Sequence, residues 1–237
     1  MVIRSKDTHD YLVEERGRDV LVLGRDNQGY TWYEPVSAAP YGMKDTEAWR
    51  RTGSPKLCPA RGCDRNLRFY PSRSLERALR LAGDWAPTLA ELLALPEEAA
   101  ALKGALLRGY PPGAQMSREQ WLTQAGVRLV QDVPATPGTR AAAYRMLAEL
   151  PGAVVADDVR DPAGRQGVAL RLPLPGADRV QLVIDRQSGD LLAVQHVGPT
   201  PGLAEGVPWS ASIIRKAGWS EVRPTPPPGC RGCAGRY

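Results

Sequence analysis

The sequence predicts an α+β fold, in which strands from both ends of the chain form one antiparallel sheet and a central helical segment packs on one face. Three observations lead to this prediction. Apolar residues alternate with period two over residues 1–36 and 153–223, whereas residues 72–150 show helical spacing with capping signals. Turn residues separate the C-terminal strands at intervals of about 10 residues. Neither strand region needs to close alone, so the simplest arrangement joins them in one sheet.

The N-terminal strands are predicted from aromatic and β-branched runs at residues 11–13, 20–23 and 30–33. A polar stretch at 14–19 is interpreted as a turn between the first two runs, and residues 26–29 form a second turn. Residues 37–71 then form an irregular loop that contains two of the four cysteines, because prolines interrupt any regular pattern there.

Helices fill residues 72–150. Ser, Thr or acidic residues at the predicted starts can accept hydrogen bonds from free backbone N–H groups in the first turn. In chain order these starts are Ser74, Thr88, Glu97 with Glu98, Ser117, and Pro137 or Thr139. The first of these helices carries Leu75, Leu79 and Ala82 on one face, and the last runs from Arg140 to Leu150 before Pro151 and Gly152 end it.

The C-terminal strands extend to a last strand over residues 210–222, and residues 1–223 are predicted to form a single domain. Residues 224–237 form a Pro-rich tail with the other two cysteines, expected to be extended and poorly packed.

Composition and charge exclude several classes of protein. The chain has 237 residues, 43% hydrophobic and 24% charged, with a net charge of +5. These are ordinary values for a folded domain, and no apolar stretch of about 18 residues predicts a membrane helix. The first residues turn polar at once, so no signal peptide is expected. Because no catalytic or phosphate-loop motif is present, we expect a protein that is not an enzyme.

The cysteines form two close pairs, Cys58 with Cys63 and Cys230 with Cys233. Two disulfides, within the pairs or between them, are one interpretation. Four thiolates around one structural zinc ion are another, and free thiols are a third. The compartment decides between them, and composition alone does not give the compartment. No cofactor is expected otherwise.

Two further groups of residues are candidate sites. Arg65, Arg68, Arg73, Arg77 and Arg80 form a basic cluster that suits an anion or a partner protein, or simply a solvated helix face. The modest net charge makes nucleic acid an improbable partner. Trp32, Trp121, Trp209 and Trp219 fall on elements that could line one apolar cavity for a lipid or peptide.

Part of the chain resembles a family of uncharacterised actinobacterial single-pass membrane proteins, often encoded near extracytoplasmic-function sigma factors. The resemblance is strongest over residues 139–192, through the runs at 140–152, 161–169 and 182–192. It implies a domain outside the cytoplasm that belongs to a membrane-tethered protein. Curved sheets with helices across one face, as in LolA-like lipoprotein carriers and RseB-like periplasmic domains, suit the β–α–β order by analogy.

The resemblance implies a non-enzymatic extracytoplasmic sensor or binding domain at the cell membrane, possessing a protein or lipid partner and linked to sigma-factor signalling. Two alternatives stay open. One is a carrier that holds a lipid or other hydrophobic ligand in a cavity against the curved sheet. The other is a zinc-stabilised module, cytoplasmic in location, that binds protein or nucleic acid.

Overall fold

The computed structural model describes residues 1–5, 11–24, 28–57, 79–176, 178–221, 228 and 234–236. Within these residues nine strands form one sheet in the order β4-β5-β6-β7-β8-β1-β2-β3-β9. All the pairings between neighbours are antiparallel. The predicted α+β class with an antiparallel sheet is therefore confirmed.

The bounds of the elements are as follows. The strands are β1 Val2–Ser5, β2 Leu12–Leu23, β3 Gln28–Pro40, β4 Val154–Arg160, β5 Gln166–Pro173, β6 Arg179–Ile184, β7 Leu191–Val197, β8 Pro208–Ile213 and β9 Ala234–Arg236. The helices are α1 Met43–Arg51, α3 Leu89–Leu93, α4 Ala99–Arg108, α5 Arg118–Gln131 and α6 Pro137–Ala148.

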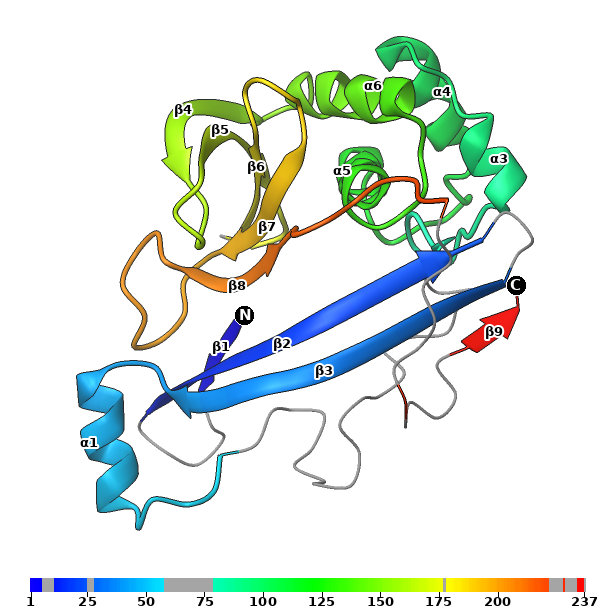
Figure 1. The fold of residues 1–237 in the computed structure, drawn as a ribbon. Helices are drawn as coiled ribbons and strands as arrows, with labels where there is room; N and C mark the ends of the chain where they lie inside the picture. The colour runs from blue at the N-terminus through cyan, green and yellow to red at the C-terminus, as the bar shows by residue number, and fades with distance from the viewer. Residues whose placement is uncertain are drawn as a thin grey trace.

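The two ends of the chain meet at the pairing of β1 with β8. Val2 lies opposite Ser210, and the backbone N–H of Ala211 donates to the Met1 carbonyl at 2.9 Å. Figure 1 shows the result: β4–β8 and the helices form one body, and the long β2–β3 pair extends beside it with α1 at one end. The sheet is thus built from both ends of the chain, as the sequence predicts.

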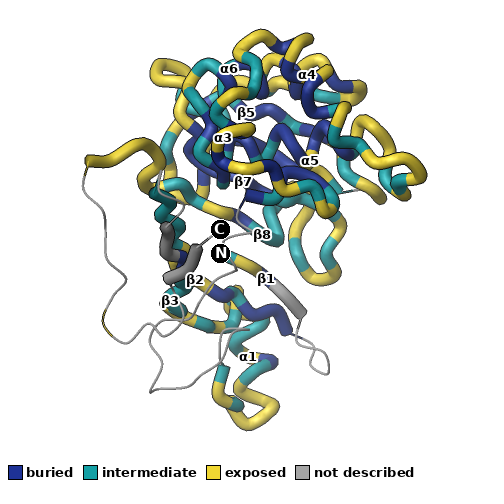
Figure 2. The backbone as a smooth tube through the Cα atoms, turned by 90° about the vertical axis from the view of Figure 1, so that its right-hand side faces the viewer, coloured by how far each residue is buried: buried dark blue, intermediate teal, exposed yellow. Residues whose placement is uncertain are grey.

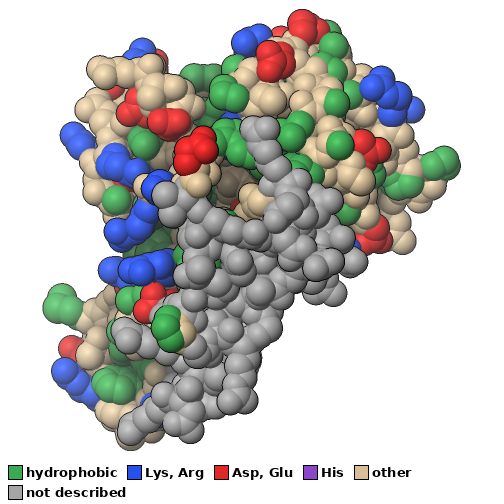
Figure 3. Space-filling model, turned by 45° about the vertical axis from the view of Figure 1, so that its right-hand side comes forward, with side chains coloured by type: hydrophobic (Ala, Val, Ile, Leu, Met, Phe, Trp, Pro, Cys, Tyr) green, Lys and Arg blue, Asp and Glu red, His purple; other side chains and the backbone are tan. Residues whose placement is uncertain are grey.

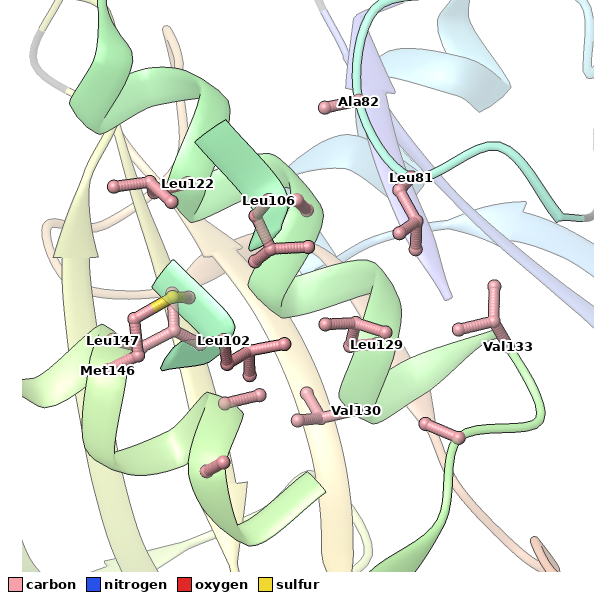
Figure 4. Packing of buried hydrophobic residues seen from close by; sticks show 14 of the residues in the cluster. Leu81, Ala82, Leu102, Leu106, Leu122, Leu129, Val130, Val133, Met146 and Leu147 are labelled. Carbon is pink, nitrogen blue, oxygen red and sulfur yellow. The ribbon is translucent and has the colours of Figure 1, made fainter. Parts of the chain in front are cut away.

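The main core lies between the helices and one face of β5–β7. Leu129 of α5, Leu147 of α6 and Leu182 of β6 are each 0% exposed and belong to the same cluster. Figure 4 shows leucine and valine side chains of α5 directed toward those of the neighbouring helices. Burial of this helical face is what the 3.6-residue spacing of the apolar residues predicts.

Small residues occupy the other face of the same strands. Ala169 pairs with Val183, and Val183 pairs with Ala193, all three with 0% exposure. Val159, which follows a bulge in β4, packs against Val183 and Ala193. Leu192, which is 8% exposed, belongs to the same cluster, so this face is built mainly, though not entirely, from small residues.

The turn predicted at residues 14–19 is wrong, because β2 continues through it as one twelve-residue strand. A bulge between Arg16 and Gly17 accommodates the polar stretch, and residues Arg16–Asp19 are exposed. Here β2 and β3 form a two-stranded ribbon with water near both faces, so polar residues at consecutive positions do not end the strand. The ring of Tyr33 lies over Gly17, where a Cβ would meet it at 2.3 Å.

The loop predicted at 37–71 is also partly wrong. β3 extends to Pro40, and α1 follows at Met43–Arg51. The Asp45 carboxylate caps α1 by accepting from the Gly42 N–H at 3.1 Å, and it also accepts from the Leu12 N–H at 2.8 Å. Prolines are tolerated at the ends and outer edges of strands, which is why Pro40 does not shorten β3.

A second, smaller core holds α1 to the ribbon. Its buried members are Tyr11, Val13 and Ala48, with Trp49 packed against them. Figure 2 shows the difference in size: most buried backbone lies in the helical body, and a short buried stretch lies beside α1.

Three of the four described central helices begin as predicted. Ser117 and Thr88 form capping boxes with Gln120 and Glu91, and Glu98 caps α4. The last helix begins earlier than either predicted residue, because Thr136 supplies the cap for α6. It ends at Ala148, two residues before the predicted Leu150.

Two further boundaries differ from their predictions. Of the helix predicted after Ser74, Leu79 is helical, whereas Ala82 forms an isolated bridge with Trp85 and does not continue the helix. The strand predicted over 210–222 ends at Ile213. Its partner β7 begins at Leu191, so little of β7 is left to pair with beyond that point, and the backbone N–H of Ile214 donates to the Leu192 carbonyl after the last paired residues. The single domain 1–223 stays a prediction. The tail predicted to be poorly packed instead pairs with the sheet at its end, where β9 (Ala234–Arg236) lies antiparallel beside β3.

Candidate binding cleft

Most residues of the predicted sites lie outside the described part of the chain. This holds for Cys58, Cys63, Cys230 and Cys233, and for Arg65, Arg68, Arg73 and Arg77. The disulfide and zinc interpretations therefore both stay predictions. Within the described residues no group of three or more His, Cys, Asp or Glu side chains is placed to hold a metal ion.

Arg80 is the one member of the predicted basic cluster that is described. Its guanidinium forms an ion pair with Asp84 at 3.0 Å, and its carbonyl accepts from the Arg128 side chain at 3.0 Å. Elsewhere on the surface Lys and Arg side chains follow one another along one margin of the face drawn in Figure 3, beside hydrophobic side chains.

The helical body carries an open cleft of about 480 Å³, which we call the aromatic cleft. Its volume is within the range of roughly 300–1,000 Å³ typical of ligand sites. The residues that line it come from the segment before α3, the α4–α5 connection and the start of α5: Gly83, Asp84, Trp85, Gly109, Pro111, Ala114, Gln115, Met116 and Trp121.

Aromatic contacts fix the shape of the aromatic cleft. Trp85 stacks on Trp121 with ring centroids 6.0 Å apart, and Tyr110 meets the edge of Trp121 at 5.6 Å. Trp121 is 1% exposed and its indole N–H donates to the Leu106 carbonyl at 3.0 Å. A fully buried and hydrogen-bonded indole gives the two outer rings a rigid support.

The connection between α4 and α5 is fixed in the same way. The Tyr110 hydroxyl donates to the Met116 carbonyl at 2.7 Å, which closes a loop of six residues. The Trp85 ring lies against the backbone of Gly109, where a Cβ would meet it at 2.6 Å. Only a glycine permits this approach, so the Trp85 ring packs directly against the backbone at the end of α4.

Polar groups at the cleft are few. The Asp84 side chain is 96% exposed, and the Arg118 guanidinium lies 5.9 Å from the centre of the Tyr110 ring. The half-buried Trp85 indole has no hydrogen-bond acceptor among the described residues. An apolar wall with a free N–H donor can hold a ring or aliphatic group and also fix its orientation.

The sequence prediction that four tryptophans line one cavity is only partly met. Trp121 lines the aromatic cleft, whereas Trp32, Trp209 and Trp219 do not. Trp209 instead contacts His196 with ring centroids 5.4 Å apart, and burial lowers the pKa of that histidine. The sequence analysis missed Trp85 and Tyr110. Tyr110 lies in a Gly-Tyr-Pro-Pro-Gly run after α4, which is the one signal that could have pointed to it, and Trp85 had none.

Comparison with known proteins adds no relative. No protein family model, curated protein or solved structure matches the chain. In the described residues no helix is long and apolar enough to cross a membrane.

Proposed function

We propose that the protein is a non-enzymatic binding module whose aromatic cleft takes a short apolar segment of a partner protein. The observation that carries the proposal is the preformed aromatic wall, in which Trp85 has an indole N–H without an acceptor among the described residues. Peptide-binding grooves use the same combination, since rings contact an apolar side chain and a donor binds the adjacent backbone carbonyl.

A proline-containing segment suits the aromatic cleft best. Proline presents a flat apolar ring and has no N–H, so it leaves no unsatisfied donor against Trp85 and Met116. Its carbonyl is a good acceptor for an indole N–H. Pre-extended chains also lose less conformational entropy on binding than flexible ones do.

A lipid carrier is a weaker candidate. It needs an enclosed apolar cavity beside the sheet, whereas the aromatic cleft is open and lies among the helices. The location outside the cytoplasm and the role as a membrane-tethered envelope sensor are part of the same proposal, and they depend on the resemblance of residues 139–192.

A fluorescence titration tests the proposal. A decaproline peptide is the probe, and sodium decanoate represents an acyl chain. We expect saturable changes in tryptophan emission with the peptide, and Trp85→Phe should weaken binding about tenfold because one hydrogen bond is lost. Trp209→Phe, which changes a tryptophan outside the cleft, serves as the matched control and should bind as the wild type does.

Two results would contradict the proposal. Saturable binding of decanoate without binding of the peptide would favour the carrier. Equal loss of peptide binding in Trp85→Phe and Trp209→Phe would place the peptide somewhere other than the aromatic cleft.

A further inference from the structure

A second recess lies at the opposite side of the sheet from the helices, between β4, β5 and β6. It has a volume of about 170 Å³ and is lined by Gly152, Val154, Arg171, Leu172, Pro173 and Arg179. We call it the arginine recess. Two of its residues carry positive charge, and no Asp or Glu is among the described residues that line it.

Strand register places the two arginines on one face. Arg171 pairs with Gln181, and Pro173 pairs with Arg179, so Arg171 and Arg179 are diagonal neighbours across β5 and β6. Side chains in this relation are within reach of each other. Two like charges side by side raise the energy of the folded protein unless an anion lies between them.

A chain of hydrogen bonds orients Arg171. Its Nε–H donates to the Gln181 side-chain oxygen at 2.7 Å, and the Gln181 amide donates in turn to the Gln195 side-chain oxygen. Gln181 and Gln195 are only 9% and 4% exposed. A guanidinium held through Nε keeps its two terminal nitrogens in a defined plane.

Those terminal nitrogens are unused within the described residues. Neither Arg171 nor Arg179 forms an ion pair there, and Arg179 forms no hydrogen bond. By contrast, Arg165 in the β4–β5 turn is bound to Asp161, and Arg186 in the β6–β7 turn is bound to Asp157. At the recess no carboxylate of the described residues takes that part for Arg171 and Arg179.

From this geometry we infer that the arginine recess binds a phosphate-type oxyanion. Two guanidinium groups balance the charge of about −1.5 to −2 that a phosphate monoester carries at neutral pH, whereas a carboxylate balances only one of them. Planar guanidinium groups also bind phosphate oxygens through paired hydrogen bonds. The small volume fits one such group and no attached ring system.

Two sources can supply this chemistry. One is a soluble phosphate compound, and the other is the headgroup of an anionic phospholipid. Val154 of β4, which is 53% exposed, lines the recess on the same face as Arg171 and would touch a lipid surface. The inference does not depend on the aromatic cleft.

NMR titration of the full chain with sodium phosphate, at ionic strength kept constant with sodium chloride, tests the inference. We expect saturable shifts at the Nε–H of Arg171 and at backbone amides of β5 and β6, with sodium acetate binding more weakly. Arg179→Gln should weaken phosphate binding at least about tenfold, through loss of charged hydrogen bonds. Arg186→Gln changes an exposed arginine in the β6–β7 turn, away from the recess, so it is the matched control and should bind normally.

Arg179 is exposed, so its variant is expected to fold, and its circular dichroism and Tm verify this before titration. Shifts that rise linearly with phosphate, or that are the same in the Arg179→Gln and Arg186→Gln variants, would overturn the inference. Co-sedimentation with phosphatidic acid vesicles that is lost in Arg179→Gln assigns the site to a lipid headgroup. Phosphate binding without co-sedimentation assigns it to a soluble compound.

Discussion

Some glycines in this chain mark places where two parts of the fold come very close. Gly126 of α5 faces Leu147 of α6, and a Cβ added there would lie 2.7 Å from the leucine Cδ2. Gly138, at the start of α6, faces the Glu97 carboxylate, where a Cβ would lie 2.4 Å from Oε2. At Gly126 the two helices pack at the distance that a hydrogen atom permits, and a side chain would push them apart. At Gly138 the close atoms belong to the end of the exposed Glu97 side chain, which can move aside.

Gly126→Ala is therefore expected to lower the free energy of unfolding by about 1–3 kcal/mol, the usual effect of overpacking a core. Gly104→Ala is the matched control, because Gly104 is exposed within α4 and a Cβ there meets nothing within 4 Å. That variant should gain about 0.5–1 kcal/mol, since alanine favours a helix over glycine. Urea unfolding measures both, and equal effects in the two variants would contradict this account.

The ion pair between Asp161 and Arg165 joins three strands. The Asp161 carboxylate, whose side chain is 0% exposed, accepts from Arg165 Nε at 2.7 Å and from the Arg165 backbone N–H at 2.8 Å. The guanidinium also donates to the carbonyls of Leu192 at 2.7 Å and Ile214 at 3.1 Å. Through these bonds the β4–β5 turn is tied to the start of β7 and the end of β8.

Removing the cation from this pair should be costly. Arg165→Ala leaves a buried carboxylate with backbone donors only, and we expect a loss on the order of 3 kcal/mol. Arg186→Ala breaks the pair with Asp157, both of whose side chains are mostly exposed, and should cost less than about 1 kcal/mol. Similar midpoints in chemical unfolding for the two variants would mean that the buried pair contributes little.

At the scale of elements, the capped helices and the C-terminal strands could be predicted from sequence, and the predicted runs at 11–13, 20–23 and 30–33 overlap β2 and β3. The continuity of the ribbon and the helix α1 could not be predicted. Caps such as Ser117 with Gln120 act within one turn, so a local pattern contains the information. β2 has no such pattern, because Arg16–Asp19 are exposed on both faces and are held by pairing with β3. The aromatic cleft was missed for a related reason: Trp85 and Tyr110 meet through Trp121, from three separate segments.

Carboxylates at element ends make stability depend on pH. Backbone N–H groups of Ala101 and Ala100 lower the pKa of Glu98, and the Thr88 N–H lowers that of Glu91. When a carboxyl group has a lower pKa in the folded protein than in the unfolded chain, the folded protein binds that proton less tightly. The stabilisation is therefore fully present above the ordinary pKa of 4.5 and is lost as the pH falls through the lower folded value.

We expect the Tm to fall steadily on acidification below about pH 4.5. Glu98→Gln should be less stable than the wild type at neutral pH and should lose less stability between about pH 5 and pH 3. Glu205→Gln changes an exposed carboxylate with no hydrogen bond among the described residues, so its pH profile should follow the wild type. If the Tm of Glu98→Gln and of the wild type fall in parallel as the pH is lowered, the Glu98 cap is not the source of the pH-dependent stability.

For the whole molecule, two cores of unequal size predict two levels of stability. The large core joins the helices to β5–β7, and the small one holds α1 to the ribbon through Tyr11, Val13 and Ala48. Leu23 at the other end of β2 packs against the large core. The ribbon is therefore anchored at both ends and weakly supported between them.

Hydrogen exchange checks this difference. Backbone amides of β2 and β3 should open with a lower free energy than those of β5, β6 and β7. Val13→Ala should lower protection in β2, β3 and α1 and leave β5–β7 unchanged, whereas Leu182→Ala should lower protection everywhere. Uniform loss of protection in Val13→Ala would mean that the two cores unfold as one unit.

The pairing of β1 with β8 sets an order of events during synthesis. Translation produces the ribbon first, yet β8 (Pro208–Ile213), which joins it to the rest of the sheet through β1, begins about 170 residues after the end of β3. During that interval the helices and β4–β7 can already fold, since their contacts lie close together in the chain. Until then part of the ribbon's backbone edge is unpaired, and we expect the charges of Glu14, Arg16 and Arg18 and the prolines at 35 and 40 to disfavour pairing of that edge with another nascent chain.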